Sequence, residues 1–244
     1  MVNGVTQSFV QLMGLPAGQL SNKYDFPAYN NVTLDEQLRI GNVDSIQTST
    51  VKVTIGGVLK GTYLLAPGQA VRINYPSLDS GPVVVEGTVG VNIISSIRSA
   101  WAVNGTITSF AQLMGMPAGQ LSNKYLFPAY NNVTLNDQLR ISNVDTVPTN
   151  VTVTIGGILR GTYPLAAGGA VRINYAGLDS GPVVVQGTSG VKIISSIREA
   201  WASNGTTTSF AQLMGLPSQQ LSTTYLFPAY NNVTLNEQLR IAVP

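Results

Sequence analysis

Apolar and polar residues alternate along several short stretches of the chain, as they do in strands that bury one face. The clearest stretch is Val51-Lys52-Val53-Thr54-Ile55. Gly56-Gly57 follows it and favours a two-residue hairpin turn, so residues 58–65 are expected to return as the partner strand. Further strands are expected at residues 24–29, 37–40, 71–75, 83–85 and 91–101. Short strands at this spacing, about seven per hundred residues, predict an all-β protein built from β-sandwiches.

One short helix is expected beside the strands, at residues 8–14 (SFVQLMG). Phe9, Leu12 and Met13 have the spacing of residues that share one helical face, and Gly14 is a common helix terminator. This pattern predicts one to two helical turns in each copy of the segment.

The alternating pattern repeats along the chain. Residues 3–40, 104–141 and 204–241 are near-copies of one segment, called block A here. Residues 51–101 and 151–201 are near-copies of a second segment, block B. The order is therefore A, B, A, B, A with a period of about 100 residues, which is the sequence signature of a tandem array.

The boundaries between folded units are less clear than the period. The loop at residues 45–50 is one residue longer than its copy at 146–150, and insertions are tolerated where little is packed. This loop therefore predicts folded units at residues 51–146 and 147–244, with residues 1–50 as a half repeat that lacks its partner. The opposite grouping, A followed by B, instead leaves the C-terminal half without a partner.

The composition excludes several functional classes. Only 10% of residues are charged, and 13 basic against 11 acidic residues give a net charge of +2 with no basic cluster, so neither nucleic acid nor an anionic membrane is an expected partner. Cys and His are absent, which removes thiol nucleophiles, imidazole bases and the usual soft-metal ligands. No apolar run reaches the length of a membrane span, so membrane insertion is not expected.

The carboxylates do not predict an active site. An acid recurs in all three block A copies only at Glu36, Asp137 and Glu237, and Asp79 lies in an Asp-Ser-Gly-Pro turn where Asp commonly caps backbone N–H groups. No stretch has the acid-rich spacing of a calcium loop. We therefore expect no catalytic residue, metal or cofactor, and no enzymatic activity.

A recurring aromatic strand is the one candidate ligand-binding feature. Exposed rings there could stack on sugars, although the favoured interpretation places them in the core. Trp101 and Trp201 are expected to pack at the junction between units, and the repeated strand arginines, such as Arg39, are expected to face solvent. The tyrosines of the candidate sugar site are Tyr24, Tyr29, Tyr125, Tyr130, Tyr225 and Tyr230.

The segments SFAQLMGLP, QLSTTYLFPAYNNVTLNEQLRI and VTVTIGGILRGTYPLAAGGAVRINY resemble the tandem repeats of large bacterial surface or secreted proteins. The resemblance covers essentially the whole chain. It implies immunoglobulin-like β-sandwich repeats of about 100 residues and an extracellular or cell-surface location, with any export signal outside this sequence, and it transfers no catalytic residue.

Two functions are therefore expected as alternatives. The first is a structural module of a stalk, sheath or filament, whose partners are other copies of itself or neighbouring repeats, and which assembles by strand addition or swapping at its half repeat. The second is a carbohydrate-binding or adhesive module with glycans as partners.

Overall fold

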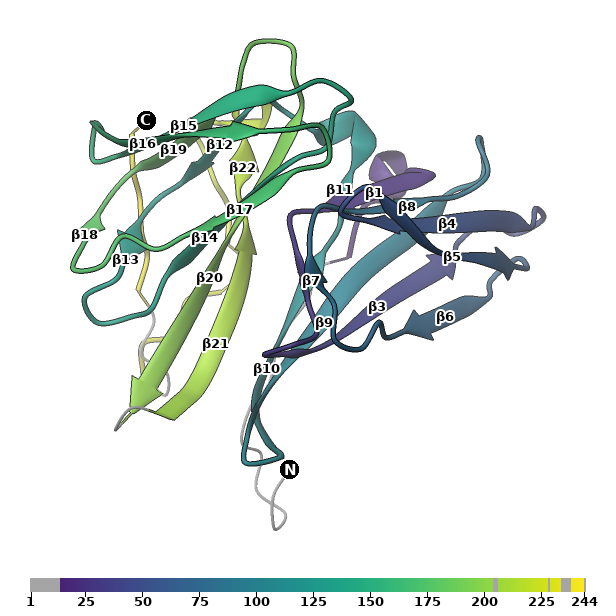
Figure 1. Ribbon diagram of the computed structural model, residues 1–244, viewed down its shortest axis with the longest axis horizontal. Coiled ribbons are helices and arrows are strands. Elements are labelled where there is room, and N and C mark those ends of the chain that lie inside the picture. The colour runs from purple at the N-terminus through teal and green to yellow at the C-terminus, as the bar shows by residue number, and fades with distance from the viewer. Residues whose placement is uncertain (1–13, 204–205, 228, 234–237, 244) are drawn as a thin grey trace.

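The structure, a computed structural model, describes residues 14–203, 206–227, 229–233 and 238–243 (Figure 1). The protein is all-β: in these residues, regular structure consists of strands and three single 3-10 turns. The three turns are η1 (Ala17–Gln19), η2 (Ala118–Gln120) and η3 (Ser218–Gln220).

Residues 14–117, the first unit, contain eleven strands. A five-stranded sheet has the order β11-β1-β8-β4-β5, a four-stranded sheet has the order β10-β9-β3-β6, and β2 pairs with β7. The strands are β1 (Lys23–Phe26), β2 (Tyr29–Asn30), β3 (Asp35–Asn42), β4 (Ser49–Ile55), β5 (Val58–Leu65), β6 (Ala70–Ile73), β7 (Asp79–Ser80), β8 (Val83–Glu86), β9 (Ile93–Val103), β10 (Thr106–Met114) and β11 (Met116–Pro117).

Residues 118–217, the second unit, repeat this arrangement. Their sheets have the orders β16-β15-β19-β12-β22, β17-β14-β20-β21 and β13-β18. The register is also the same, since Tyr24 lies opposite Val85 and Tyr125 opposite Val185. The strands are β12 (Lys124–Phe127), β13 (Tyr130–Asn131), β14 (Gln138–Asn143), β15 (Thr149–Ile155), β16 (Ile158–Leu165), β17 (Ala170–Ile173), β18 (Asp179–Ser180), β19 (Val183–Gln186), β20 (Ile193–Ser203), β21 (Thr206–Met214) and β22 (Leu216–Pro217).

Each unit has one apolar core between its two larger sheets. In β4, Val51, Val53 and Ile55 are buried, whereas Lys52 is exposed, so the alternation in sequence is the alternation of strand faces. The first core takes side chains from both sheets, among them Tyr24, Phe26, Leu38, Ile40, Val51, Val53, Val83, Val85, Ile93 and Ile97.

The short helix expected at residues 8–14 and in each copy of that segment does not form in the two copies that the structure describes. Residues 8–13 lie outside the described residues, but the two later copies of the segment form β10 and β21. Each pairs along its length with the preceding strand, β9 or β20. A segment of one to two turns is too short to be stable as a helix alone, and the neighbouring strand offers hydrogen bonds to every second residue.

Strand pairing groups the blocks differently from the expected boundaries at residues 51–146 and 147–244. β1 and β3, which belong to residues 1–50, lie in the same sheets as the first block B. Residues 43–48 connect β3 to β4 within one unit, and residues 49–50 of the expected boundary loop already belong to β4. The boundary instead falls inside block A: residues 106–117 complete the first unit as β10 and β11, and the remainder of that block begins the second.

The segment without a partner is consequently at the C-terminal end. Residues 218–243, the tail, correspond to residues 118–143 of the second unit. In its described residues after η3, the tail forms no strand. The expectation that residues 1–50 are the half repeat is therefore not met, because β1 and β3 pair within the first unit.

A buried tyrosine on the short strand pair of each unit, β2-β7 or β13-β18, bonds to the backbone beside the four-stranded sheet. The Tyr130 hydroxyl donates to the backbone carbonyl of Asp137 at 2.9 Å and accepts from the backbone N–H of Tyr175 at 2.8 Å. Tyr29 makes the equivalent bonds with Glu36 and Tyr75. Both tyrosine side chains are fully buried, so no solvent replaces these bonds if they are lost.

We expect Tyr130→Phe to lower the free energy of unfolding by about 1.5 kcal/mol, because it leaves the part-buried N–H of Tyr175 without its acceptor and removes one of the two bonds to the Asp137 carbonyl, which keeps the Asn174 amide at 2.8 Å. Tyr225→Phe is the matched control: its ring is 52% exposed and its hydroxyl accepts one bond from Ser222, so the expected change is within about 0.5 kcal/mol. Chemical denaturation followed by tryptophan fluorescence measures both. Equal effects of the two changes would contradict this role.

Candidate interaction site between the units

The two units meet through the outer face of the sheet β17-β14-β20-β21 and one end of the first unit. The Ser142 hydroxyl on β14 donates to the backbone carbonyl of Pro27, and the Arg172 guanidinium on β17 donates to the carbonyl of Tyr29 at 3.4 Å. In Figure 1, β20 and β21 lie on the side of the second unit that faces the first. The junction buries charged and hydrogen-bonding side chains, among them Glu36, Arg140 and Ser142, and it is the candidate functional site.

A buried arginine and a buried glutamate occupy the centre of the junction. Arg140 is 1% exposed and Glu36 is fully buried. The Glu36 carboxylate accepts from the backbone N–H of Asn30 at 2.6 Å and from the Ser99 hydroxyl at 2.7 Å. Burial raises the pKa of Glu36 and lowers the pKa of Arg140 to about 10, and the attraction between the two charges opposes both shifts.

A second arginine makes an ion pair at the edge of this centre. Arg172 pairs with Asp79 of the first unit, and both side chains keep partial solvent exposure. Asp79 lies in the two-residue strand β7, although its Asp-Ser-Gly-Pro context predicts an ordinary turn residue. Its position at the junction could not be inferred from that context.

The third arginine packs on an aromatic pair. The Arg198 guanidinium lies 5.5 Å from the centre of the Trp101 ring, close enough for a cation–π interaction. The Trp101 ring contacts Phe210 of the second unit at a centroid distance of 5.9 Å, beside the buried Ala111 and Ala200. The expected position of Trp101 at a junction is confirmed.

These contacts correct the solvent-facing role expected for the strand arginines. Arg140 is 1% exposed and Arg198 8%, because the first unit covers the sheet face from which they project. Alternation predicts correctly that they point away from their own core. The sequence could not show that another unit covers this face.

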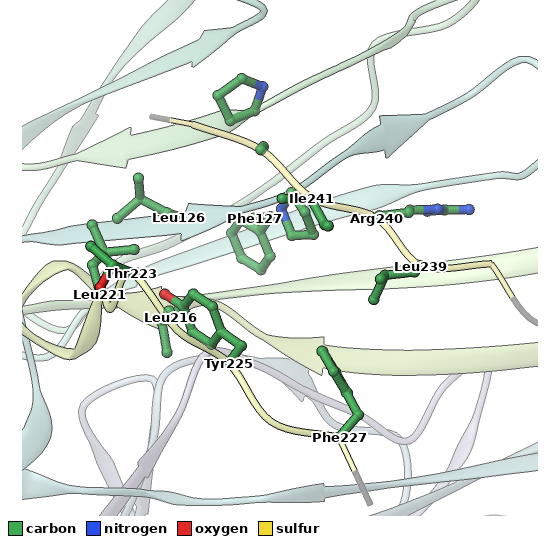
Figure 2. A pocket seen from close by; sticks show the side chains of 13 residues that line it. Leu126, Phe127, Leu216, Leu221, Thr223, Tyr225, Phe227, Leu239, Arg240 and Ile241 are labelled. Atoms are coloured by element: carbon green, nitrogen blue, oxygen red, sulfur yellow. The ribbon is translucent and has the colours of Figure 1, made fainter. Parts of the chain in front are cut away.

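The tail repeats part of the same contact on the second unit. Arg240, the tail counterpart of Arg140, pairs with Glu199 at 3.2 Å, and Glu199 is the counterpart of Ser99. The tail also crosses the outer face of β12 and β22, where it borders an apolar pocket of about 440 Å³ (Figure 2). Leu126 and Leu216 line this pocket from the second unit, and Leu221, Tyr225 and Ile241 line it from the tail.

The tail nevertheless leaves large apolar side chains in solvent. Tyr225 is 52% exposed, Leu226 91% and Phe227 68%, whereas their counterparts Tyr125, Leu126 and Phe127 are buried. Tyr125 and Phe127 are covered because they belong to the apolar core of the second unit. The tail has the sequence of a core strand, but its described residues after η3 join no sheet.

The structure divides the six candidate sugar-stacking tyrosines into two groups. Tyr24, Tyr29, Tyr125 and Tyr130 are 0% exposed, so their rings have no surface on which a sugar could stack. The core interpretation is confirmed for these four. The other two, in the tail, are Tyr225 at 52% exposed and Tyr230 at 62%.

Neither a metal site nor a membrane span is found in the described residues. They contain no group of three or more Asp or Glu side chains that could hold a metal ion. None of their helices is long and apolar enough to cross a membrane.

Neither a protein-family model nor a curated protein matches this chain. Among solved structures, it is similar to an anti-sigma factor domain-containing protein, with 8% identity, coverage of 82% of both chains and a TM-score of 0.22. It is similar at a TM-score of 0.18 to a GH2 β-galacturonidase from Eisenbergiella tayi, with 10% identity over 80% of this chain and 35% of that one. A Pleurotus ostreatus lectin has the same TM-score, with 14% identity over 80% and 81%. At these scores the similarities carry no argument about fold or function.

A buried carboxyl group at the junction has no hydrogen-bond partner. Asp25, on β1, is 0% exposed, and neither of its side-chain oxygens is bonded to any described residue. Its counterparts are Leu126 and Leu226, and this difference between copies is visible in the sequence. Burial raises the pKa of Asp25 to about 7, with Lys23 opposing, Glu86 adding to the shift and Lys192 of the second unit opposing.

The raised pKa makes the contribution of Asp25 to stability dependent on pH. The ordinary value is 3.8, so the folded protein holds this proton more tightly than the unfolded chain does. The free-energy cost of ionising Asp25 in the folded protein is absent below about pH 4. It grows as the pH rises and reaches its full value above about pH 7. The difference between 3.8 and about 7 corresponds to at most about 4 kcal/mol.

We expect Asp25→Asn to stabilise the protein above pH 7 and to have little effect at pH 4, because the amide resembles the protonated carboxyl group. Thermal unfolding from pH 4 to pH 8 measures the gap between variant and wild type. Asp44→Asn is the control: backbone N–H groups of Gln47 and Ile46 lower the pKa of this exposed carboxyl, so its contribution is lost only on acidification. A gap for Asp25→Asn that does not change with pH would refute this account.

Proposed function

We propose that the chain is a structural repeat module of an extracellular or cell-surface stalk, sheath or filament, built from immunoglobulin-like β-sandwich units. Two pairs of facing sheets with the same order and register support the repeat architecture. The single observation that carries the function is the tail, which exposes the apolar side chains of a core strand. The module assembles when the tail enters a unit of a second copy.

The first unit of another copy is the site that accepts the tail. Residues 215–241 are a near-copy of residues 14–40, which supply β1 and most of β3 to the first unit. β1 lies between β8 and β11, and β3 between β6 and β9, so each contributes hydrogen bonds on both edges. A tail that replaces these strands would bury Tyr225 and Phe227 where Tyr24 and Phe26 lie now. Strand exchange of this kind joins copies head to tail.

Introduced cysteines test this exchange, because the natural chain has none. Lys23 lies opposite Glu86, and Thr224 is the tail counterpart of Lys23. We expect the double variant Thr224→Cys, Glu86→Cys to form disulfide-linked oligomers under mild oxidation, since the exchanged tail places the two cysteines on neighbouring strands.

The matched control is Thr224→Cys with Lys52→Cys. Lys52 lies opposite Glu86 on the other side, so an exchanged tail keeps residue 52 one strand farther away. Non-reducing gels and light scattering measure the linked species. Equal linkage in both double variants, or none in either, would count against strand exchange.

The second candidate is a carbohydrate-binding or adhesive module, favoured by the exposed rings of Tyr225 and Tyr230. Aromatic rings of this kind stack on sugars when they share one accessible surface. If this function holds, a glycan array gives a signal that Tyr225→Ala abolishes while the thermal stability stays within a few degrees of wild type. An unchanged signal, or none for the wild type, would exclude it.

A further inference from the structure

Three arginines of one unit and an acidic end of the preceding unit form one complete joint in this chain. The arginine face of this joint consists of Arg140, Arg172 and Arg198. Its acidic end consists of Glu36 and Asp79, with Ser99 beside them. Complementary charges at such a contact favour one register over others.

The second unit has its own acidic end, and this end is only partly covered. Its corresponding residues are Asp137, Asp179 and Glu199. Arg240 of the tail pairs with Glu199, whereas exposed Asp179 makes no ion pair with any described residue. No described residue of the tail corresponds to Arg172, which pairs with Asp79 in the complete joint.

Asp137 gives a second, independent indication that this end is incomplete. Its side chain is 0% exposed, and one carboxylate oxygen accepts from the backbone N–H of Asn131 at 2.7 Å. The other oxygen has no hydrogen-bond partner among the described residues, whereas both oxygens of its counterpart Glu36 are bonded. A buried carboxylate oxygen without a donor favours the approach of a cationic or hydrogen-bonding group.

The first unit has a matching arginine face that no described segment covers. Arg39 and Arg98 are half-buried and Arg72 is exposed, and they are the counterparts of the three arginines in the complete joint. Burial and the nearby charges of Arg98 and Arg72 lower the pKa of Arg39. One carboxylate, Asp35, offsets this charge at 3.1 Å from Arg98. Like charges gathered on one face attract an anionic partner surface.

We propose that the arginine face of the first unit docks on the acidic end of the second unit of another copy, in the geometry that the two units of one chain already have. Arg72 of one copy then pairs with Asp179 of the other, as Arg172 pairs with Asp79. The inference rests on the proposed strand exchange: the tail that enters the accepting copy brings Arg240 into the place of Arg39, next to Arg72 and Arg98 of that copy. The exchanged unit therefore has a complete arginine face.

Charge reversal at positions 72 and 179 tests this joint without touching the internal one, which uses Asp79 and Arg172. Arg72→Asp alone places two aspartates opposite each other between copies, and Asp179→Arg alone places two arginines. We expect each variant alone to self-associate at least about tenfold more weakly than wild type. A one-to-one mixture restores opposite charges in both kinds of mixed joint, so association should return to within about threefold of wild type.

Lys52→Asp is the matched control, because it makes the same charge reversal on an exposed strand position away from the junction. Light scattering over a concentration series at low salt gives the association constants, and thermal unfolding of each monomer confirms that the variants fold. The cysteine pair at positions 224 and 86 is carried in every variant to report strand exchange separately.

The possible results separate the two proposals. Weak association of each variant alone and recovery in the mixture support the arginine joint. Unchanged association of both variants, with cross-linking through residues 224 and 86 intact, overturns the joint and leaves strand exchange standing. A wild type that neither associates nor cross-links overturns both.

Discussion

The architecture depends on one backbone interaction: each unit takes its last strands from the block that begins the next unit. β10 pairs with β9 along its length, and β11 pairs with β1, so residues 106–117 close both larger sheets of the first unit. Without them, β1 and β9 would be edge strands with open hydrogen-bonding groups. Consecutive units therefore cannot be separated by a linker, and η2 follows β11 directly.

This sharing of block A explains why the junction is polar and buried at the same time. The chain crosses from one unit to the next without a spacer, so the outer face of β14 and β20 is held against the end of the first unit. Arg140, Glu36 and Ser99 are removed from water by this contact. Buried charges contribute little net stability, but they penalise misaligned arrangements strongly. Neighbouring units that are nearly identical could pair in wrong combinations. A free-energy cost for misaligned charges disfavours those combinations.

The sequence predicted the strands well and their partners poorly. Alternation identified β4 and β6 because inward and outward residues differ in polarity there. It failed at residues 109–114, where three apolar residues fit both one helical face and a strand packed on both sides. The length difference at residues 45–50 marks tolerance to insertion, which is a property of any surface loop and does not show which strands pair.

The candidate site was even less accessible to sequence reasoning. The outward direction of Arg140 follows from alternation, but the surface that covers it belongs to residues about 100 positions away in sequence. Asp25 was visible only as a departure from Leu126 and Leu226, and such a difference does not reveal burial. The exposed tail was one of two groupings that the repeat order allowed. Only the pairing of β1 and β3 decided between them.

Hydrogen exchange measured by mass spectrometry on the monomeric full chain, with and without Tyr29→Phe, tests the shared-block claim most directly. If residues 106–114 belong to the first unit, destabilising that unit at Tyr29 accelerates exchange there together with residues 51–103, and leaves residues 149–186 protected. The described tail residues 221–227 and 229–233 exchange rapidly in both proteins. Exchange at residues 106–114 that instead follows residues 149–186, or a tail protected as well as residues 122–143, would contradict the account.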